Sequence, residues 1–287
     1  MKTIMAVFVV LFIAAAVTAA EKTQSPKTPA VPLQQKAAAE AGMPLEKTIE
    51  LGVDVNMVLV YIPAGEFDMG SPATEMERDS DEGQHHIKLT KAFYMGKFEV
   101  TQLQYRAIMN ENNSKFGGDK LPIENINWHE AGRYLKKLSD KTGLKFRLPT
   151  EAQWEYACRA GTTTAFNTGT TIDSDFANYN AKDAYADGII GKYLDRTTDV
   201  GSYQPNAFGL YDMHGNVWEW CSDIYEKDYY KITPIIDPKG PQEGGSRVIR
   251  GGGWDEKACK CRSADRNSRG PKADRADIGF RVVLEIE

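Results

Sequence analysis

Two stretches in the last third of the chain combine tryptophan with glycine, and this combination constrains the fold most. One is Gly209-Leu-Tyr-Asp-Met-His-Gly-Asn-Val-Trp-Glu-Trp220, and the other is Arg250-Gly-Gly-Gly-Trp254. Glycine weakens a regular strand because it leaves no side chain to pack. Glycine beside tryptophan instead indicates a backbone that approaches large rings closely or bends sharply around an ion. We therefore expect an irregular, loop-rich fold with aromatic packing between its segments.

The composition of the 287 residues is typical of a globular chain with a sizeable core. Hydrophobic residues make up 41% and charged residues 26%, which disfavours wholesale disorder. The net charge of −5 and the lack of a basic stripe argue against a nucleic-acid partner.

Residues 1–20 have the pattern of an export signal. Lys2 precedes an apolar run over residues 4–17, and small residues precede Glu21. This run is shorter than the roughly 20 residues that a membrane-spanning helix needs. No cysteine follows the run directly, which disfavours a lipid anchor. We therefore expect cleavage, a mature form without a membrane span, and a periplasmic or secreted location.

The rest of the chain is predicted to contain a linker followed by one domain. Residues 21–50 are rich in Lys, Ala, Pro, Gln and Thr and predict a flexible linker, so the domain is placed at residues 51–287. A continuous apolar, β-branched run ended by Pro63 predicts a strand at 57–62, and alternation predicts one at 86–89. Further strands are predicted at 66–69, after the Ala64-Gly65 turn, and at 92–100. Capping residues and apolar spacing predict helices at 101–110, 129–142 and 150–160. The acidic stretch 71–84 is interpreted as a solvated loop.

The cysteines and the long polar segment leave alternatives open. One or two long-range disulfides among Cys158, Cys221, Cys259 and Cys261 are compatible with their even number, and the sequence does not decide the connectivity. Zinc is disfavoured because no Cys-x-x-Cys or His-x-x-x-His spacing is present. Residues 162–204 have little periodicity, and a loop of this length is expected to be functional or held by something other than a core, such as an ion.

Six motifs, in order along the chain, resemble the formylglycine-generating enzyme family, also called the sulfatase-modifying factor family. They are Ile62-Pro-Ala-Gly-Glu-Phe-Asp-Met-Gly70, Phe93-Tyr-Met with Glu99-Val-Thr101, Arg147-Leu-Pro-Thr-Glu-Ala-Gln-Trp-Glu-Tyr-Ala157, the two glycine–tryptophan stretches, and Ile278-Gly-Phe-Arg281. The resemblance implies a single α+β domain of the C-type-lectin-like kind, with little regular secondary structure and bound calcium. It implies several functions: copper-dependent oxidation of a sulfatase cysteine to formylglycine, iron-dependent sulfoxide synthesis, periplasmic maturation of a siderophore peptide, or ligand binding alone.

The resemblance also implies two calcium sites. The first maps onto the Asp212 and Glu219 side chains and the Gly215 and Val217 carbonyls, which are hard oxygen ligands that suit calcium. The alternative is that the two acids only cap turns. The second site maps onto the Asn178 side chain and the Tyr179 carbonyl. In this second site, the position of the acidic ligand falls at Lys192, whose side chain cannot bind a cation. The position of the later carbonyl ligand falls at Leu194. Either Asp187 or Asp195 serves instead, or this site is weak or lost.

The copper centre departs from the family pattern. The resemblance places Gly253 where a serine is expected and Glu256 where the first copper-binding cysteine is expected. Cys259 and Cys261 lie nearby, and in an extended segment they would point the same way and could share a soft metal. We favour the interpretation that Cys261 is a buried structural thiol. The histidines form no facial set for iron, and His214 is interpreted as a lone surface histidine.

Three functional hypotheses follow. The first is an exported, calcium-stabilised member that recognises or modifies a peptide or protein without the copper-binding cysteine pair, with Trp218 and Trp254 at the substrate site. The second is an oxidase that uses copper at Cys259 and Cys261, or another group such as Glu256. The third is a non-catalytic lectin-like binding module that presents residues 162–204 and 255–275. The basic residues of the latter segment are interpreted as a solvated face; they are Arg262, Arg266, Arg269, Lys272 and Arg275.

Overall fold

A computed structural model describes residues 30–286 of the chain. The predicted export signal at residues 1–20 lies outside this described part. Within residues 30–286, no helix is both long enough and apolar enough to cross a lipid bilayer.

The largest sheet has five strands in the order β1-β2-β5-β11-β6, and every neighbouring pair is antiparallel. The strands are β1 (Glu46–Gly52), β2 (Val55–Ile62), β5 (Phe93–Gly96), β11 (Val283–Glu285) and β6 (Phe146–Arg147). Strand β11, close to the C-terminus, lies between β5 and β6. The sheet therefore joins the two ends of the domain.

Two smaller sheets complete the strand framework. One has the order β10-β7-β8-β9, with β7 (Trp218–Ile224), β8 (Arg247–Arg250), β9 (Asn267–Arg269) and β10 (Ile278–Gly279). The other pairs β3 (Gly65–Met69) with β4 (His85–Leu89). The predicted strands at 57–62, 66–69 and 86–89 are confirmed, whereas the strand predicted at 92–100 is limited to β5.

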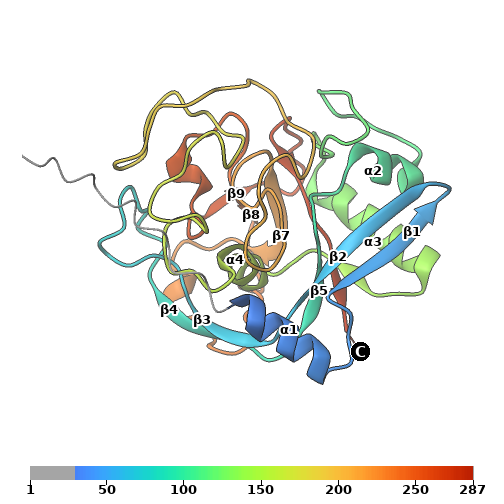
Figure 1. Ribbon diagram of the computed structural model, residues 1–287, viewed down its shortest axis with the longest axis horizontal. Coiled ribbons are helices and arrows are strands. Elements are labelled where there is room, and N and C mark those ends of the chain that lie inside the picture. The colour runs from blue at the N-terminus through green and yellow to red at the C-terminus, as the bar shows by residue number, and fades with distance from the viewer. Residues whose placement is uncertain (1–29, 287) are drawn as a thin grey trace, which may run out of the picture.

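Within the described residues, four α-helices and two short 3₁₀ turns accompany the sheets: α1 (Ala30–Glu40), α2 (Gln102–Met109), α3 (Trp128–Thr142), α4 (Glu151–Arg159), η1 (Tyr229–Lys231) and η2 (Ala258–Cys261). The three predicted helices are confirmed. Each of α2, α3 and α4 begins with a capping box, in which the side chains of the N-cap and N3 residues bond to each other's backbone N–H groups. Helices α2 and α3 pack beside β1 and β2 (Figure 1).

The segment predicted as a flexible linker contains ordered structure. Residues 30–40 form α1 and residues 46–52 form β1. Ile49 and Leu51 alternate with exposed residues along β1 and are buried. The Gln34 amide donates to the backbone carbonyls of Tyr61 and Phe208 at 2.7 and 3.1 Å, which fixes α1 against β2. The ordered fold therefore begins before residue 51.

Residues 162–204 form no helix or strand in the structure, as the sequence predicts. They lie on the side of the molecule away from α3 in Figure 1. An aromatic cluster anchors them: Phe166, Tyr179 and Tyr185 are buried together with Ala258 and Cys261 of η2. Phe166 meets Tyr185 edge-on, with ring centroids 5.3 Å apart. A satellite core thus holds this long loop against the C-terminal third of the chain.

Candidate functional site

The two glycine–tryptophan stretches meet in the centre of the domain. The Gly215 N–H donates to the Gly251 carbonyl at 2.7 Å, and the Trp254 N–H donates to the Asn216 carbonyl at 2.8 Å. Gly215 has a φ of +84°, and a Cβ at this position would overlap with the backbone oxygen of Asn178. The predicted approach of backbone to a large ring is found at Gly251, where a Cβ would lie 3.0 Å from the Trp154 ring, whereas the close neighbour of Gly215 is backbone.

A fully buried guanidinium holds the acid of the first stretch. Arg281 donates from Nε and Nη2 to the Glu219 carboxylate at 2.6–2.8 Å, and its other contacts are the Gly96 and Tyr211 carbonyls at 3.0 Å each. Trp154 Nε1 donates to Glu219 Oε2 at 2.7 Å. Both oxygens of Glu219 therefore have partners, and the family motif ending in Arg281 has a structural explanation.

Two further acids lie near Arg281, so this centre carries more carboxylates than guanidinium groups. Asp212 accepts from the Gly201 N–H at 2.7 Å through Oδ2, while its buried Oδ1 has no partner. Glu99 accepts from Asn216 Nδ2 at 2.7 Å and from the Val217 N–H at 3.2 Å. Burial raises the pKa of Asp212 to about 6, with a smaller contribution from Glu219. Burial also raises the pKa of Glu99, and the negative charges of Asp212 and Glu219 raise it further.

This arrangement fits a calcium ion in part. A buried, unpartnered Asp212 oxygen beside surplus negative charge is the feature that a hard cation would satisfy. Glu219, assigned as a ligand from the sequence, is already occupied by Arg281 and Trp154. Sequence reasoning did not include Glu99 among the ligands, although it lies in the family motif Glu99-Val-Thr101.

The second predicted calcium position is also only partly matched. Asn178 is 2% exposed, and its Oδ1 has no partner, while its Nδ2 donates to the Arg196 carbonyl at 2.9 Å. Asn178 lines a small cavity of about 180 Å³ together with Lys192 and Leu194, the two residues that the family resemblance places at the same calcium position. The acid in this cavity is Asp175, not Asp187 or Asp195. The Tyr179 hydroxyl donates to the Ile172 carbonyl at 3.1 Å.

Three carboxylates converge beside Trp254. Asp255 and Glu256 follow it directly in the chain, and Asp277 comes from a separate segment. One oxygen each from Asp255, Glu256 and Asp277 lies within 4.8 Å of the other two. Asp277 accepts from Arg275 Nε and Nη2 at 2.8 and 2.9 Å, whereas Asp255 Oδ1 is buried without a partner. Burial raises the pKa of Asp255 to about 6, with further contributions from Asp277 and Glu256. We call Asp255, Glu256 and Asp277 the carboxylate cluster.

Aromatic rings border the carboxylate cluster. Trp218 Nε1 donates to Glu256 Oε1 at 3.3 Å, and Trp254 Nε1 donates to the Ala276 carbonyl at 2.9 Å. Phe116 meets the Trp254 ring edge-on at 5.5 Å between centroids, and Tyr193 stacks near it at 6.4 Å. Of the two tryptophans predicted to bind substrate, Trp218 is fully buried and holds Glu256, while Trp254 is 6% exposed.

A fourth acid adds to the negative charge of this region. Glu124 is fully buried, accepts from the Phe116 N–H at 2.9 Å and has a second oxygen without a partner. Burial raises its pKa to about 7, and the charge of Asp277 contributes to the shift. Neither Asp277 nor Glu124 was identified from the sequence. The signal for Asp277 is its position just before the family motif Ile278-Gly-Phe-Arg281.

The cysteines do not form a paired thiolate site. Cys259 and Cys261 lie on the 3₁₀ turn η2, so the extended geometry that would point them the same way is absent. Cys261 is fully buried, its thiol donates to the Lys257 carbonyl at 3.7 Å, and burial raises its pKa. Burial and Glu77 raise the pKa of Cys259 to about 11. All four cysteines are free in the structure, so none of the disulfides that the sequence permits is formed.

His214 is buried, which corrects its interpretation as a surface histidine. Its side chain is 5% exposed, Nδ1 bonds to the Cys261 carbonyl at 2.7 Å, and Nε2 accepts from the Asn167 N–H at 3.0 Å. Burial lowers its pKa to about 4, so the ring is neutral with the proton on Nδ1. His214 therefore ties the long loop to η2.

Two of the arginines assigned to a solvated or partner-binding face are internal. Arg262 is fully buried and donates to Glu75 and Glu82 at 2.6–2.7 Å, and Arg266 is 4% exposed and donates to Glu151 at 2.8 and 3.1 Å. The acidic stretch 71–84 supplies part of this network, so it is not simply a solvated loop. The binding surface proposed for residues 255–275 cannot include Arg262 or Arg266.

Comparison with known proteins gives consistent findings. Residues 53–286 match the sulfatase-modifying factor enzyme 1-like domain. The chain is 35% identical over 186 residues to a formylglycine-generating enzyme of Streptomyces coelicolor, covering 60% of this chain and 55% of that protein. It is 31% identical over 257 residues to the serine/threonine-protein kinase pkn1 of Chlamydia pneumoniae, covering 79% of this chain. The solved structure of Treponema denticola variable protein 1 superposes with a TM-score of 0.74 at 28% identity, covering 84% of this chain and 99% of that chain.

The aligned region spans only part of the curated relatives. It covers 38% of the Chlamydia pneumoniae kinase and 55% of the Streptomyces coelicolor enzyme. The fold that the sequence predicts, a single α+β domain of the formylglycine-generating enzyme kind, is confirmed by these likenesses.

Proposed function

Because the chain belongs to the sulfatase-modifying factor enzyme 1-like family, we propose that it is an exported, calcium-stabilised member that binds a cationic peptide or protein segment. The binding site is the carboxylate cluster beside Trp254, with the fully buried Trp218 positioning Glu256 through its Nε1, and formylglycine chemistry through a pair of copper-binding thiolates is not its activity. The observation that carries this proposal is the convergence of Asp255, Glu256 and Asp277 where the family pattern places a cysteine.

The chemistry of the cluster favours a basic ligand group. Three carboxylates are neighboured by one guanidinium, Arg275, which bonds to Asp277. Asp255 and Glu124 each keep a buried oxygen without a partner, and a buried acceptor gains most from a donor. A Lys or Arg side chain would supply donors and positive charge to the free carboxylate oxygens. The chain's own Lys115 and Lys182 already lie over the Trp254 and Tyr193 rings, at 5.4 and 4.4 Å from the ring centroids. Relatives named formylglycine-generating enzymes support a peptide or protein as the ligand.

The surroundings of the two thiols support the proposal that formylglycine chemistry at a pair of copper-binding thiolates is not the activity. Copper(I) binds thiolates, and burial raises the pKa of both Cys259 and Cys261, which disfavours the thiolate form. Cys261 is packed so closely that a Cβ on Gly252 would overlap its sulfur. It therefore serves the packing of the satellite core.

Binding of an Arg- and Lys-rich peptide is expected to weaken about tenfold or more when Asp255→Asn and Glu256→Gln are combined, because two ligand-facing charges are lost. Fluorescence anisotropy of the labelled peptide measures the change. The affinity of the unsubstituted protein should rise as pH rises through about 6, since Asp255 then ionises.

A matched control for this experiment is Glu50→Gln with Asp54→Asn. Both residues are exposed around the turn between β1 and β2, and the pair makes the same change in net charge. Equal weakening by the control pair, or unchanged peptide binding in the cluster variant, would contradict the proposed site.

Calcium is expected to raise the melting temperature of the protein, and Asp212→Gly should remove most of that rise. At 100 times its dissociation constant, a ligand that binds only the folded state contributes about 2.7 kcal/mol. Gly is chosen because Asp212 has a φ of +56°, which glycine adopts without strain. Scanning calorimetry with calcium, magnesium and chelator measures the increment. An equal calcium effect in Asp212→Gly would exclude this residue as a ligand.

A further inference from the structure

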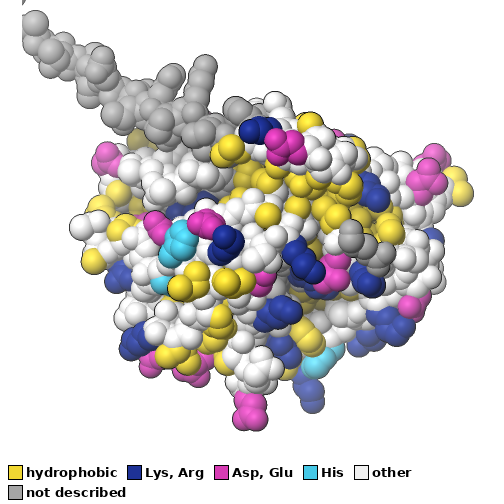
Figure 2. Space-filling view, turned by 90° about the horizontal axis from the view of Figure 1, so that it is seen from below, with side chains coloured by type: hydrophobic (Ala, Val, Ile, Leu, Met, Phe, Trp, Pro, Cys, Tyr) yellow, Lys and Arg dark blue, Asp and Glu magenta, His cyan; other side chains and the backbone are white. Residues whose placement is uncertain are grey.

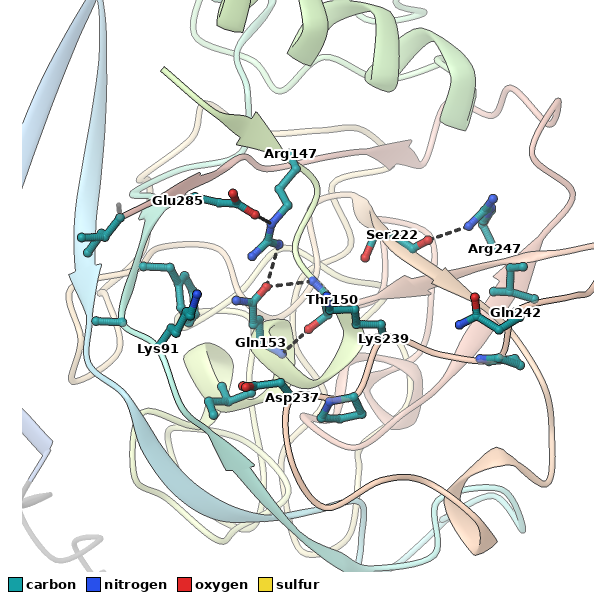
Figure 3. Close-up of a pocket in the computed structure, with 17 residues that line it drawn as sticks. Lys91, Arg147, Thr150, Gln153, Ser222, Asp237, Lys239, Gln242, Arg247 and Glu285 are labelled. Atoms are coloured by element: carbon teal, nitrogen blue, oxygen red, sulfur yellow. Dashed lines mark hydrogen bonds and ion pairs between the residues drawn. The ribbon is translucent and has the colours of Figure 1, made fainter. Parts of the chain in front are cut away.

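A second cavity lies away from the carboxylate cluster and shares none of its residues. It has a volume of about 640 Å³ and is formed by the start of β5, by β6, by the first turn of α4 and by residues 237–247, which return toward β8 (Figure 3). This volume is within the range of roughly 300–1,000 Å³ that small-molecule sites have.

Basic side chains reach this cavity from different elements. Lys91 and Lys239 line it, both are exposed, and neither has an ion-pair partner among the described residues. Arg147 and Arg247 also line it (Figure 3). Figure 2 shows Lys and Arg side chains interspersed with Asp and Glu on one face of the molecule. The protein as a whole has a net charge of −5, so this positive region is a local feature.

The two acids of the cavity are already engaged. Glu285 accepts from Arg147 Nε at 2.8 Å, and Asp237 accepts from the Thr90 N–H at 2.9 Å and from the Thr90 hydroxyl. Four basic groups and two acids leave the cavity with a surplus of two positive charges. Among the described lining residues, Arg147 is paired with Glu285, whereas Lys91, Lys239 and Arg247 have no ion-paired carboxylate and together outweigh the charge of Asp237.

The guanidinium groups are fixed before any ligand arrives. Arg147 Nη1 donates to the Leu148 carbonyl at 2.9 Å and to Gln153 Oε1 at 2.8 Å, which leaves Nη2 without a described partner. Arg247 donates to the Ser222 carbonyl at 2.6 Å, and its guanidinium lies 4.0 Å from the centroid of the Trp128 ring. A fixed guanidinium matches the planar geometry of a carboxylate.

The wall opposite α4 is also fixed. Gly240 has a φ of +77°, and a Cβ there would contact the Asp223 side chain and the Ile224 carbonyl, so this turn presses directly on β7. The first turn of α4 is not the source of anion binding. Its Thr150 and Gln153 cap each other, and the Glu151 N–H donates to Asp223 at 3.0 Å. The attraction for an anion therefore comes from the side chains of Lys91, Lys239 and the two arginines.

We propose that this cavity binds a ligand bearing two or more carboxylates. The two unpaired lysines come from separate segments of the lining, so a ligand with two carboxylates can engage both of them. Its lining also includes Phe93, Pro238 and Pro241, which suit the carbon skeleton between the carboxylates. A free polycarboxylate and an acidic peptide segment share this chemistry, and probes of both kinds separate them.

The test is calorimetric titration of the full mature protein with citrate, with a triglutamate peptide and with inorganic phosphate. We expect at least one carboxylate probe to bind, and Lys91→Gln with Lys239→Gln to weaken that binding about tenfold or more. Added salt should weaken it as well, because the lysines are exposed. Citrate alone would indicate a free polycarboxylate, and triglutamate alone an acidic peptide segment; either result supports the proposal.

The control is Lys120→Gln with Lys137→Gln, which removes the same charge from exposed positions outside the cavity. This pair should bind the probe as the unsubstituted protein does. Binding of phosphate but of neither carboxylate probe, no binding of any probe, or equal affinities in the two double variants would overturn the proposal. The peptide-binding test at the carboxylate cluster uses other residues and an opposite charge, so the two results are independent.

Discussion

Replacing Arg281 by methionine is expected to destabilise the fold by about 3–5 kcal/mol, the cost of removing one partner from a buried ion pair. The substitution leaves the buried Glu219 without its guanidinium, close to Glu99 and Asp212. It also leaves the Gly96 and Tyr211 carbonyls without their donor. Urea unfolding of the purified variant at pH 7 in the presence of chelator measures the loss.

Two companion variants separate this effect from a general loss of charge. Arg133→Met removes an exposed guanidinium on α3 that pairs with Glu130 at 3.3 Å, and surface pairs contribute about 0–1 kcal/mol. Adding Glu219→Met to Arg281→Met should restore part of the stability, because the isolated buried charge is gone. A loss below about 1 kcal/mol for Arg281→Met would show that the ion pair does not hold the centre together.

Gly215→Ala is expected to cost about 3 kcal/mol, from a positive φ that alanine adopts poorly and from overpacking. The added Cβ would meet the backbone oxygen of Asn178, which cannot rotate away as a side chain can. Because the Asn216 N–H donates to the same Asn178 oxygen at 2.8 Å, the strain would spread into the proposed calcium region. Thermal and urea unfolding measure it.

The matched control is Gly132→Ala. Gly132 lies within α3, and a Cβ there meets nothing within 4 Å. Alanine favours a helix over glycine by roughly 0.5–1 kcal/mol, so this variant should be slightly more stable. If Gly215→Ala were as stable as Gly132→Ala, the loop would have to be free to move away from Asn178, contrary to its packing in the structure.

Local signals in the sequence predicted much of the regular structure. The two residues of each capping box in α2 and α4 lie three positions apart in the chain. Thr101 and Thr150 could therefore be recognised as N-cap residues without any tertiary information. A continuous apolar run located β2, and short local patterns located β3 and β4, for the same reason. The glycine–tryptophan stretches correctly indicated close backbone contact, because a positive φ and the lack of a Cβ are properties of single residues.

The errors arose where distant partners decide the outcome. Arg262 looked exposed because its charge suggests solvent, but Glu75 and Glu82 lie about 180 residues earlier and bury it as an ion pair. β1 was missed because its polar residues hide a short alternation that matters only once β2 pairs with it. His214 looked solvated because its partners, Cys261 and Asn167, belong to other loops.

The candidate site was predicted in the same uneven way. The departure at Glu256 was visible from the family pattern, whereas its hydrogen bond with Trp218 was not predicted. The other carboxylates were not visible, because Asp277 and Glu124 reach the region from separate segments. Whether Cys259 and Cys261 could share a metal depended on local backbone geometry, and the 3₁₀ turn separates their directions.

The most direct test of this account is copper binding and aldehyde formation by the mature protein and by its Cys259→Ser, Cys261→Ser variant. Both proteins would be loaded with copper under reducing conditions and then incubated in air with a cysteine-containing sulfatase peptide, with metal content and peptide mass measured. We expect no formylglycine from either protein and the same copper content in both. One equivalent of copper with aldehyde formation, both lost in the double variant, would contradict the conclusion that carboxylates have replaced the thiolate centre.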